Sequence, residues 1–385
     1  MCGAKDPIMK ALEFAQQLVA FDSVSRKSNL DVSDFVANEL KRLEFEVERL
    51  EYMDDHGVRK ANLVAKRGVG VGGIAYFAHT DVVPADDWSI DFCGPFAPTV
   101  KEGKLWGRGS CDMKGSLACA LAAASEIEPC KQSAPIYIVC TADEEVGMSG
   151  ARHINQFSKM FEEMVRNDTV GVIGEPTELR VVHAHKGGCR IEITARGISA
   201  HSSTKDGVNA NWKLIPMLAK LGELQVLTET DPAYQNLEFD PPTLSGNIVI
   251  TNQPLAANVT TSLARAAWFL RTMPKVNIQP LLQQVRESCE ELGLECDLRY
   301  SIDPLWVDPN SKYVQRAIQL AGCSHSEVVC YATDGGVLRR LKNLVVCGPG
   351  SIDQAHRSDE WISLEQLEKG TALYRRFFEY WGLKN

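Results

Sequence analysis

The pattern of apolar and polar positions along the chain predicts an α/β fold. Short continuous apolar runs are typical of buried strands in a central sheet, and they occur at Ile74–Ala78, Ile136–Thr141 and Val170–Ile173. Apolar residues at helical spacing predict helices that flank this sheet, at Ile8–Val19, Leu30–Leu43, Tyr313–Ala321 and Leu364–Trp381. Apolar and charged residues alternate in Phe45–Tyr52, which predicts an exposed edge strand.

The pattern changes from about His183, where a second and smaller domain is predicted. Strands and helices then follow in the order β-α-β-β-α-β, the ferredoxin-like pattern of an α+β domain. The segments are Arg190–Arg196, Asn209–Leu224, Gly246–Ile250, Ala264–Arg271, Val276–Leu292 and Cys296–Tyr300. After residue 301 the α/β pattern resumes. We therefore expect a larger domain formed by residues 1–181 and 302–385, with residues 182–301 inserted into it.

Length, charge and cysteine usage narrow the class of protein. A chain of 385 residues exceeds the roughly 250–300 residues at which one core stops growing, so two domains are expected. The net charge of −9 argues against nucleic acid as a partner, because proteins that bind polyanions usually carry a basic patch. The twelve cysteines are scattered and form no C-x-x-C pair, which favours reduced thiols.

The sequence also predicts a cytoplasmic protein. It contains no run of about 18 apolar residues that could span a bilayer, and Met1–Lys10 lacks the apolar core of a signal peptide. We therefore expect no membrane partner.

An aspartate in a glycine-rich loop is the first candidate for chemistry. Asp112 lies in the segment Arg108–Gly115, just before the small-residue run Ser116–Ala124. Glycine allows a ligand to approach the backbone closely, and loops often carry catalytic residues. We interpret Asp112 as a carboxylate that bridges two metal ions. The alternative is that Asp112 only caps the following helix.

Further acidic residues and a histidine follow the predicted buried strands. His79 and Asp81 are two residues apart and project to the same side, as suits a metal ligand and a carboxylate that orients it; a hydrogen-bonded core pair is the alternative. Glu144 and Glu145 are predicted to point to opposite sides of a strand end, so that one can bind a metal while the other faces the substrate water. A solvated acidic turn is the alternative there. Glu175 follows the third buried run.

Together these positions predict a two-metal hydrolytic centre. The candidate ligands are His79, Asp112, Glu145, Glu175 and His356. Nitrogen and oxygen ligands without thiolates are typical of zinc, cobalt or manganese sites that leave room for water. Two divalent ions about 3.5–4 Å apart repel by on the order of 20 kcal/mol at an effective dielectric of about 20, so a bridging anion is needed. Three carboxylates and one hydroxide balance the charge of two such ions, which predicts an ionised water as the nucleophile.

Five motifs occur in order along nearly the whole chain: His79-x-Asp81, Gly107-Arg-Gly-x-x-Asp112-Met-Lys-Gly115, Asp143-Glu-Glu145, Gly174-Glu-Pro-Thr177 and Gln354-Ala-His356. This series resembles the dinuclear zinc deacylase and carboxypeptidase superfamily, which includes acetylornithine deacetylase, succinyl-diaminopimelate desuccinylase, aminoacylase and glutamate carboxypeptidase. The resemblance implies a zinc-peptidase-like catalytic domain with a central mixed sheet flanked by helices. It also implies that the inserted ferredoxin-like domain is a lid that serves in dimerisation.

The resemblance implies how two metal ions, zinc or else cobalt or manganese, are bound. One ion is expected to be held by His79, Asp112 and Glu175, and the other by Asp112, Glu145 and His356. In relatives the peptide bond that follows the bridging aspartate is cis, which implies a cis bond between Asp112 and Met113.

The remaining site residues also take their roles from the resemblance. Glu144 corresponds to the general base that takes a proton from the bridging water and passes it to the leaving amine, and Asp81 to the residue that orients the metal-bound histidine. In the lid, His201 corresponds to a histidine that stabilises the oxyanion, in many relatives from the partner subunit of a homodimer. Asn258 and Arg271 correspond to positions that bind the substrate carboxylate.

Subfamily features favour one reaction. Two segments resemble acetylornithine deacetylase: Gly348–His356, which is followed by Ser358-Asp-Glu360, and Gly174–Gly188. A third segment, Thr333-Asp-Gly-Gly336, departs from that subfamily and from the desuccinylases. We therefore expect hydrolysis of a small N-acyl, in the simplest case N-acetyl, amino acid to a carboxylate and a free amine, as in N-acetylornithine deacetylation in arginine biosynthesis. The alternatives are a succinyl-diaminopimelate desuccinylase or a related deacylase or dipeptidase, and a non-catalytic binding protein on the same fold.

Overall fold

The computed structural model describes residues 7–383, so the first six of the ten N-terminal residues considered above lie outside it. The chain divides into two compact units, which we call unit 1 and unit 2. Unit 1 comprises Met1–His183, Val307–Glu327 and Thr333–Asn385, and unit 2 comprises Ala184–Trp306 and Val328–Ala332. Among the described residues, no helix combines the length and the apolar character that crossing a membrane requires.

The centre of unit 1 is a mixed sheet whose middle strands are parallel. They lie side by side in the order β6 (Ile136–Thr141), β3 (Ile74–His79), β7 (Val170–Pro176) and β15 (Leu344–Gly348). Their side chains are almost all buried, which explains the continuous apolar runs, because both faces of the strands are covered. The sheet continues through antiparallel β2 (Arg59–Arg67) to β1 (Glu46–Met53), which is its edge strand as predicted.

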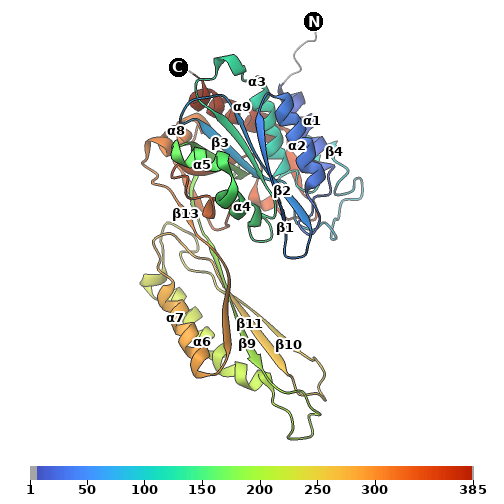
Figure 1. Cartoon of the computed structure of the whole chain (residues 1–385), viewed down its shortest axis with the longest axis vertical. Coiled ribbons are helices and arrows are strands. Elements are labelled where there is room, and N and C mark those ends of the chain that lie inside the picture. Colours follow the sequence, from blue (N-terminus) through green and yellow to red (C-terminus); the bar gives the residue numbers. More distant parts are fainter. Residues whose placement is uncertain (1–6, 384–385) are drawn as a thin grey trace. The chain divides into compact units, whose positions relative to one another are not determined.

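Helices cover both faces of this sheet (Figure 1). Neighbouring residues of β2 point to opposite faces and contact different helices. The Arg67 guanidinium donates to the carbonyl of Ala124 in α3 (Lys114–Glu126), whereas Lys66 pairs with Glu163 in α5 (Lys159–Arg166). Helix α3 packs against α1 (Pro7–Val19) and α9 (Leu364–Gly382). Its small residues are buried from Lys114 to Ala124, so α3 can approach the sheet closely.

The remaining elements of unit 1 are shorter. Helices α2 (Leu30–Arg42) and α4 (Ser149–Phe157) contact the sheet, and α8 (Lys312–Ala321) contacts α9. A small separate sheet is formed by β4 (Thr99–Lys101), β5 (Lys104–Trp106) and β16 (Trp361–Ser363). Helices α4 and α5 were not predicted from the sequence, because helices this short depend on packing and caps more than on intrinsic propensity. The hydroxyl of Ser158, for example, accepts the Phe161 amide at the start of α5.

Unit 2 confirms the predicted ferredoxin-like order. Its elements follow as β9 (Gly188–Arg196), α6 (Ala210–Thr230), β10 (Asn247–Gln253), β11 (Leu263–Leu270), α7 (Gln279–Glu291) and β12 (Glu295–Ile302). The strands form one antiparallel sheet in the order β10-β11-β9-β12, and α6 and α7 lie side by side along it (Figure 1). Helix α6 continues to Thr230, six residues beyond the predicted end, because Leu224 and Thr228 extend its buried face.

Short strands link the two units along the chain. The chain enters unit 2 through β8 (Val182–His185), whose first residue pairs with Val346 of β15. It leaves through β13 (Leu305–Trp306) and returns once as β14 (Glu327–Val329).

Candidate metal centre

The parallel strands of unit 1 bring the predicted ligands to one edge of the sheet. His79 is the last residue of β3, Glu175 lies near the end of β7, and Glu145 follows β6. His356 follows β15 after a short 3₁₀ turn. Because parallel strands present their carboxyl ends at the same edge, where open α/β sheets bind ligands, these side chains meet although they are far apart in the sequence.

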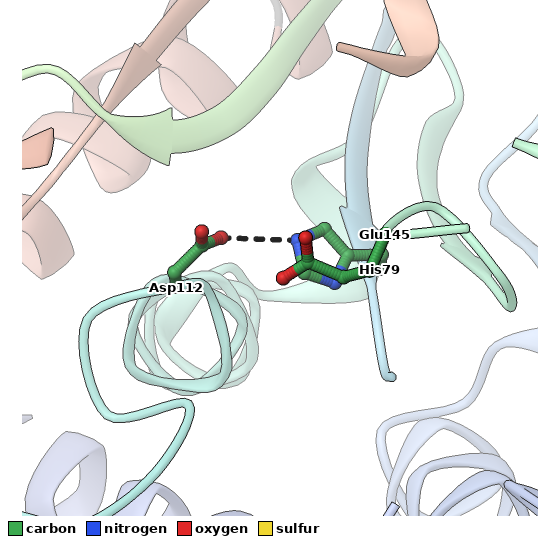
Figure 2. A group of neighbouring side chains, drawn as sticks. All are labelled: His79, Asp112 and Glu145. Carbon is green, nitrogen blue, oxygen red and sulfur yellow. Dashed lines mark hydrogen bonds and ion pairs between the residues drawn. The ribbon is translucent and has the colours of Figure 1, made fainter. Parts of the chain in front are cut away.

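Asp112 lies between two histidines. The distance from His79 Nε2 to Asp112 Oδ1 is 3.0 Å, and that from His356 Nε2 to Asp112 Oδ2 is 3.3 Å. Glu175 Oε1 is 3.8 Å from His79 Nε2, and Glu145 Oε2 is 3.0 Å from His356 Nε2. Figure 2 shows His79, Asp112 and Glu145 facing one another, and each of these three offers an atom within 4.8 Å of the other two. The two Asp112 oxygens therefore face different histidines, as a bridging ligand requires.

The chemistry of this donor set fits divalent cations. His79 Nδ1 donates to the backbone carbonyl of Asp81 at 2.9 Å, which leaves Nε2 as the nitrogen that can bind a metal. Three carboxylates lie beside two imidazoles, so the cluster carries excess negative charge in a largely buried place, and buried charge requires a partner. Nitrogen and oxygen donors match zinc, cobalt or manganese.

The pKa values in the cluster reflect this excess of negative charge. Burial, together with the neighbouring Asp112, raises the pKa of Glu175 well above its usual range. Hydrogen bonds to Asp112 and Glu145 raise the pKa of His356 to about 10. Burial alone would lower the pKa of His79, but Asp112 and Glu175 raise it well above its usual value. The neighbouring carboxylates therefore favour a positive charge at both imidazoles.

The loop that carries Asp112 is fixed from the far end of the chain. The Glu360 carboxylate accepts the backbone N–H groups of Gly109, Cys111 and Asp112 at 2.8–3.0 Å and pairs with the Arg108 guanidinium at 2.9 Å. Glu360 and Arg108 are each only 1% exposed. The Asp112–Met113 peptide bond is cis, as the resemblance implied. Nothing in a single sequence links Glu360 to a loop about 250 positions away, so the subfamily motif alone could not predict this contact.

The adjacent residues Glu144 and Glu145 differ in their surroundings, but strand alternation is not the cause. Strand β6 ends at Thr141, and Asp143, Glu144 and Glu145 lie in a turn that begins with Asp143 at φ 57°. The expectation that strand alternation separates the glutamates is therefore wrong, because both lie beyond the strand. The turn aims Glu145 at His356. Burial raises the pKa of Glu144 well above its usual range; His79 opposes this shift, and Glu175 adds to it.

Asp81 holds this turn through its carboxylate. It accepts the hydroxyl of Ser25 at 2.7 Å and the backbone N–H groups of Glu144 at 3.2 Å and Glu145 at 3.4 Å. Its Oδ1 is 3.8 Å from His79 Nδ1, so the acceptor of the hydrogen bond from that ring is the backbone carbonyl of Asp81 and not its carboxylate. Asp81 therefore contacts His79 through its backbone carbonyl and the turn of Glu144 and Glu145 through its carboxylate.

The three predicted lid residues lie in unit 2, and they do not all lie together. The exposed His201 pairs with Val259 in a β-bridge, and Ser202 N–H donates to the carbonyl of Asn258, so His201 and Asn258 lie on adjacent loops. Arg271 follows the opposite end of β11, a strand of eight residues that spans roughly 27 Å. This end lies beside Cys189, close to where the chain enters unit 2.

Comparison with known proteins identifies relatives of this chain and solved structures that share its fold. The model of peptidase family M20/M25/M40 matches residues 75–380. An acetylornithine deacetylase from Proteus mirabilis is 32% identical, with 96% of each chain covered, and one from Myxococcus xanthus is 32% identical, with 94% of each chain covered.

Solved structures show the same fold at lower identity. A tripeptidase from Staphylococcus aureus has a TM-score of 0.72 at 19% identity, covering 97% of this chain and 98% of that one. A dinuclear metal-binding M20 peptidase from Bacillus subtilis has a TM-score of 0.63 at 15% identity, covering 97% and 98%. The matched family model spans most of the chain, and the relatives match nearly its full length. This protein therefore belongs to peptidase family M20/M25/M40.

Proposed function

We propose that this M20 protein is a metal-dependent hydrolase that removes the acyl group from an N-acyl amino acid. The favoured substrate is N-acetylornithine, in a cytoplasmic step of arginine biosynthesis. The observation that carries the proposal is the position of Asp112, whose two carboxylate oxygens face His79 and His356. Glu175 lies beside His79, and Glu145 lies beside His356. The curated relatives, acetylornithine deacetylases at 31–33% identity over 94–97% of this chain, support the choice of substrate.

The proposed site would hold two divalent ions, with Asp112 as a ligand of both. His79 and Glu175 complete one ligand set, and Glu145 and His356 complete the other. Zinc is the favoured metal, and cobalt or manganese suits the same donors. When bound, such ions polarise a carbonyl oxygen and lower the pKa of water. The dinuclear M20 peptidase that shares this fold supports two ions rather than one.

In this proposal the chain's own groups move the proton and hold the substrate. Glu144 accepts a proton from the attacking water and delivers it to the leaving amine, and its raised pKa suits a group that must both take and return a proton. His201 donates to the amide oxygen as negative charge develops there. Asn258 and Arg271 bind the substrate carboxylate, and Asp81 orients His79 and the turn that carries Glu144.

A homodimer is part of the same proposal. His201 and Asn258 lie at the end of the unit 2 sheet far from Arg271 and from the point where the chain enters that unit. One chain supplies Arg271 at one end of this sheet and His201 at the other, so a site that uses both is completed most simply by two chains. Unit 2 is then the dimerisation lid.

The test is a substrate panel on purified protein, freed of metal by a chelator and reloaded with zinc, cobalt or manganese. It compares N-acetylornithine, N-acetylcitrulline, N-succinyl-diaminopimelate and a simple dipeptide. The highest kcat/KM on N-acetylornithine supports the proposal. The highest value on the succinyl compound or the dipeptide would replace it with a desuccinylase or dipeptidase. Full metal loading without turnover of any N-acyl amino acid would favour a binding protein instead.

A further inference from the structure

A buried lysine lies behind the turn that carries Glu144. Lys60 is in strand β2, and its side chain is 1% exposed. Its ammonium group donates to the backbone carbonyls of Ser25 and Lys27, the second at 2.8 Å, and forms an ion pair with Asp143 Oδ1 at 2.7 Å. Two of the three N–H groups of the ammonium therefore have carbonyl acceptors, and the carboxylates of Asp143 and, at 3.6 Å, Asp54 supply the counter-charge. A buried ammonium is costly unless it is paired in this way.

Asp143 is held on both of its carboxylate oxygens. Oδ1 faces Lys60, and Oδ2 accepts the hydroxyl of Tyr52 at 2.7 Å. Asp143 adopts a left-handed backbone conformation at φ 57°, which is uncommon for a residue other than glycine, and its carbonyl accepts the Met148 N–H at 2.8 Å. The side-chain contacts therefore fix the residue at which the chain turns toward Glu144.

A second route connects the same lysine to Glu144. The carbonyl of Ser25 accepts from Lys60, while the hydroxyl of Ser25 donates to Asp81 at 2.7 Å. Asp81 in turn accepts the backbone N–H of Glu144 at 3.2 Å. The contacts form a closed ring through Lys60, Asp143, Glu144, Asp81 and Ser25, so the Glu144 backbone is restrained from both sides.

We infer that Lys60, with Tyr52 and Asp143, positions Glu144 for proton transfer, a role that rests on the proposed function of Glu144 and adds positioning residues outside the metal cluster. Lys60 and Tyr52 both contact Asp143, which is not one of the predicted metal ligands. Their effect is on the placement of the Glu144 backbone, and a displacement of about 1 Å can cost on the order of 100-fold in rate.

The chain offers a matched control on the same strand. Lys66 lies six residues after Lys60, so alternation places both on one face of β2, and it pairs with Glu163 of helix α5 at 2.6 Å. Lys60→Met should lower kcat by about 10- to 100-fold with KM within about threefold, because the chemical step depends on geometry more than binding does. Lys66→Met removes an ion pair of the same strand and should leave kcat unchanged.

A milder variant keeps the inference testable if Lys60→Met fails to fold. Tyr52→Phe retains the ring that lies 5.0 Å from the His153 ring and removes only the hydroxyl that binds Asp143. It should lower kcat by about 3- to 10-fold, as expected for the loss of one hydrogen bond. All variants are compared with metal added to saturation, and their metal content is measured.

Hydrogen exchange gives a readout that needs no turnover. The amides of Glu144 and Glu145 donate to Asp81, so they should exchange at least about 10-fold faster in Lys60→Met than in the wild-type and Lys66→Met proteins if the ring opens. Faster exchange confined to this turn supports positioning. Faster exchange throughout unit 1, with a matching fall in Tm and no specific loss of kcat, would assign Lys60 a general structural role and overturn the inference.

A double-mutant cycle separates this inference from the proposed function. If Lys60 acts through Glu144, then Lys60→Met should reduce kcat little further in a Glu144→Gln background. Independent, multiplicative losses would overturn the inference. A Glu144→Gln enzyme with wild-type kcat would instead overturn the proposed role of Glu144, and the exchange measurement would still report whether Lys60 holds the turn.

Discussion

Glu144 and Glu145 are adjacent in the sequence, yet their neighbours suit them to different tasks. Glu145 lies 3.0 Å from His356 Nε2 and belongs with the predicted metal ligands. Burial and nearby carboxylates raise the pKa of Glu144, which makes its carboxyl group readier to accept a proton. Burial raises the pKa of Glu145 as well, so the difference between the two residues is the contact with His356, toward which the turn after Asp143 directs Glu145.

Glu144→Gln tests the division between the two glutamates. The change keeps the size of the side chain and removes its ability to accept and return a proton. We expect kcat to fall by about 10²- to 10⁴-fold, the range for the loss of a general base. Metal content, measured by mass spectrometry on the reloaded protein, should stay at the wild-type level. An active variant would remove the base role, and loss of metal would show that Glu144 is itself a ligand.

The loop before α3 depends on a segment that is distant in the sequence. Its three backbone N–H groups and the Arg108 guanidinium all converge on Glu360, the residue before β16. Charge-assisted hydrogen bonds of this kind are stronger than neutral ones. The C-terminal part of the chain thus holds Asp112 in place, and the metal centre depends on the docking of β16 against β5.

Glu360→Gln should destabilise unit 1 strongly. The side chain keeps its shape, but its amide group would face N–H donors, and Arg108 would be buried without its counter-charge. Breaking a buried ion pair from one side typically costs about 3–5 kcal/mol, measured here by urea unfolding. Glu365→Gln is the control, because it removes only the exposed i,i+4 pair with Lys369 and should change little. Equal stability of the two variants would contradict the assigned role of Glu360.

At the scale of the whole molecule, unit 2 holds apart residues that act together in the proposed mechanism. His201 and Asn258 lie on adjacent loops, and Arg271 follows the far end of β11. The eight-residue strand β11 separates these two ends by roughly 27 Å. In a dimer each chain can contribute one end to each of two sites.

Mixing inactive variants tests whether His201 acts across a dimer. His201→Ala should lower kcat with little effect on metal content, since His201 is an exposed residue of unit 2 and all five predicted ligands belong to unit 1. A heterodimer of His201→Ala and Glu144→Gln chains, isolated with two affinity tags, then contains one complete site of two if the histidine acts in trans. About half of the wild-type kcat per dimer is expected. No recovery in verified heterodimers would place His201 in its own chain's site or remove its role.

Much of the fold follows from local patterns. Apolar runs such as Ile136–Thr141 predicted the buried strands, and alternation in Phe45–Tyr52 predicted the edge strand, because burial on two faces or one imposes those patterns directly. The helices α4 and α5 were missed because they are short and depend on contacts such as Ser158 with Glu48. The turn at Asp143 was misjudged because its left-handed conformation is set by its contacts with Lys60 and Tyr52.

By itself, the sequence determined the class of fold, the order of elements in unit 2 and the main buried strands of unit 1, and it supplied the candidate metal ligands. These depend on residue type and on spacing within single elements. Only the tertiary structure decided that Asp112 faces two histidines, that Glu360 accepts hydrogen bonds from the Asp112 loop and that Lys60 pairs with Asp143 next to Glu144. Such contacts join residues up to about 250 positions apart, and a buried charge is tolerated only where folding delivers its partner.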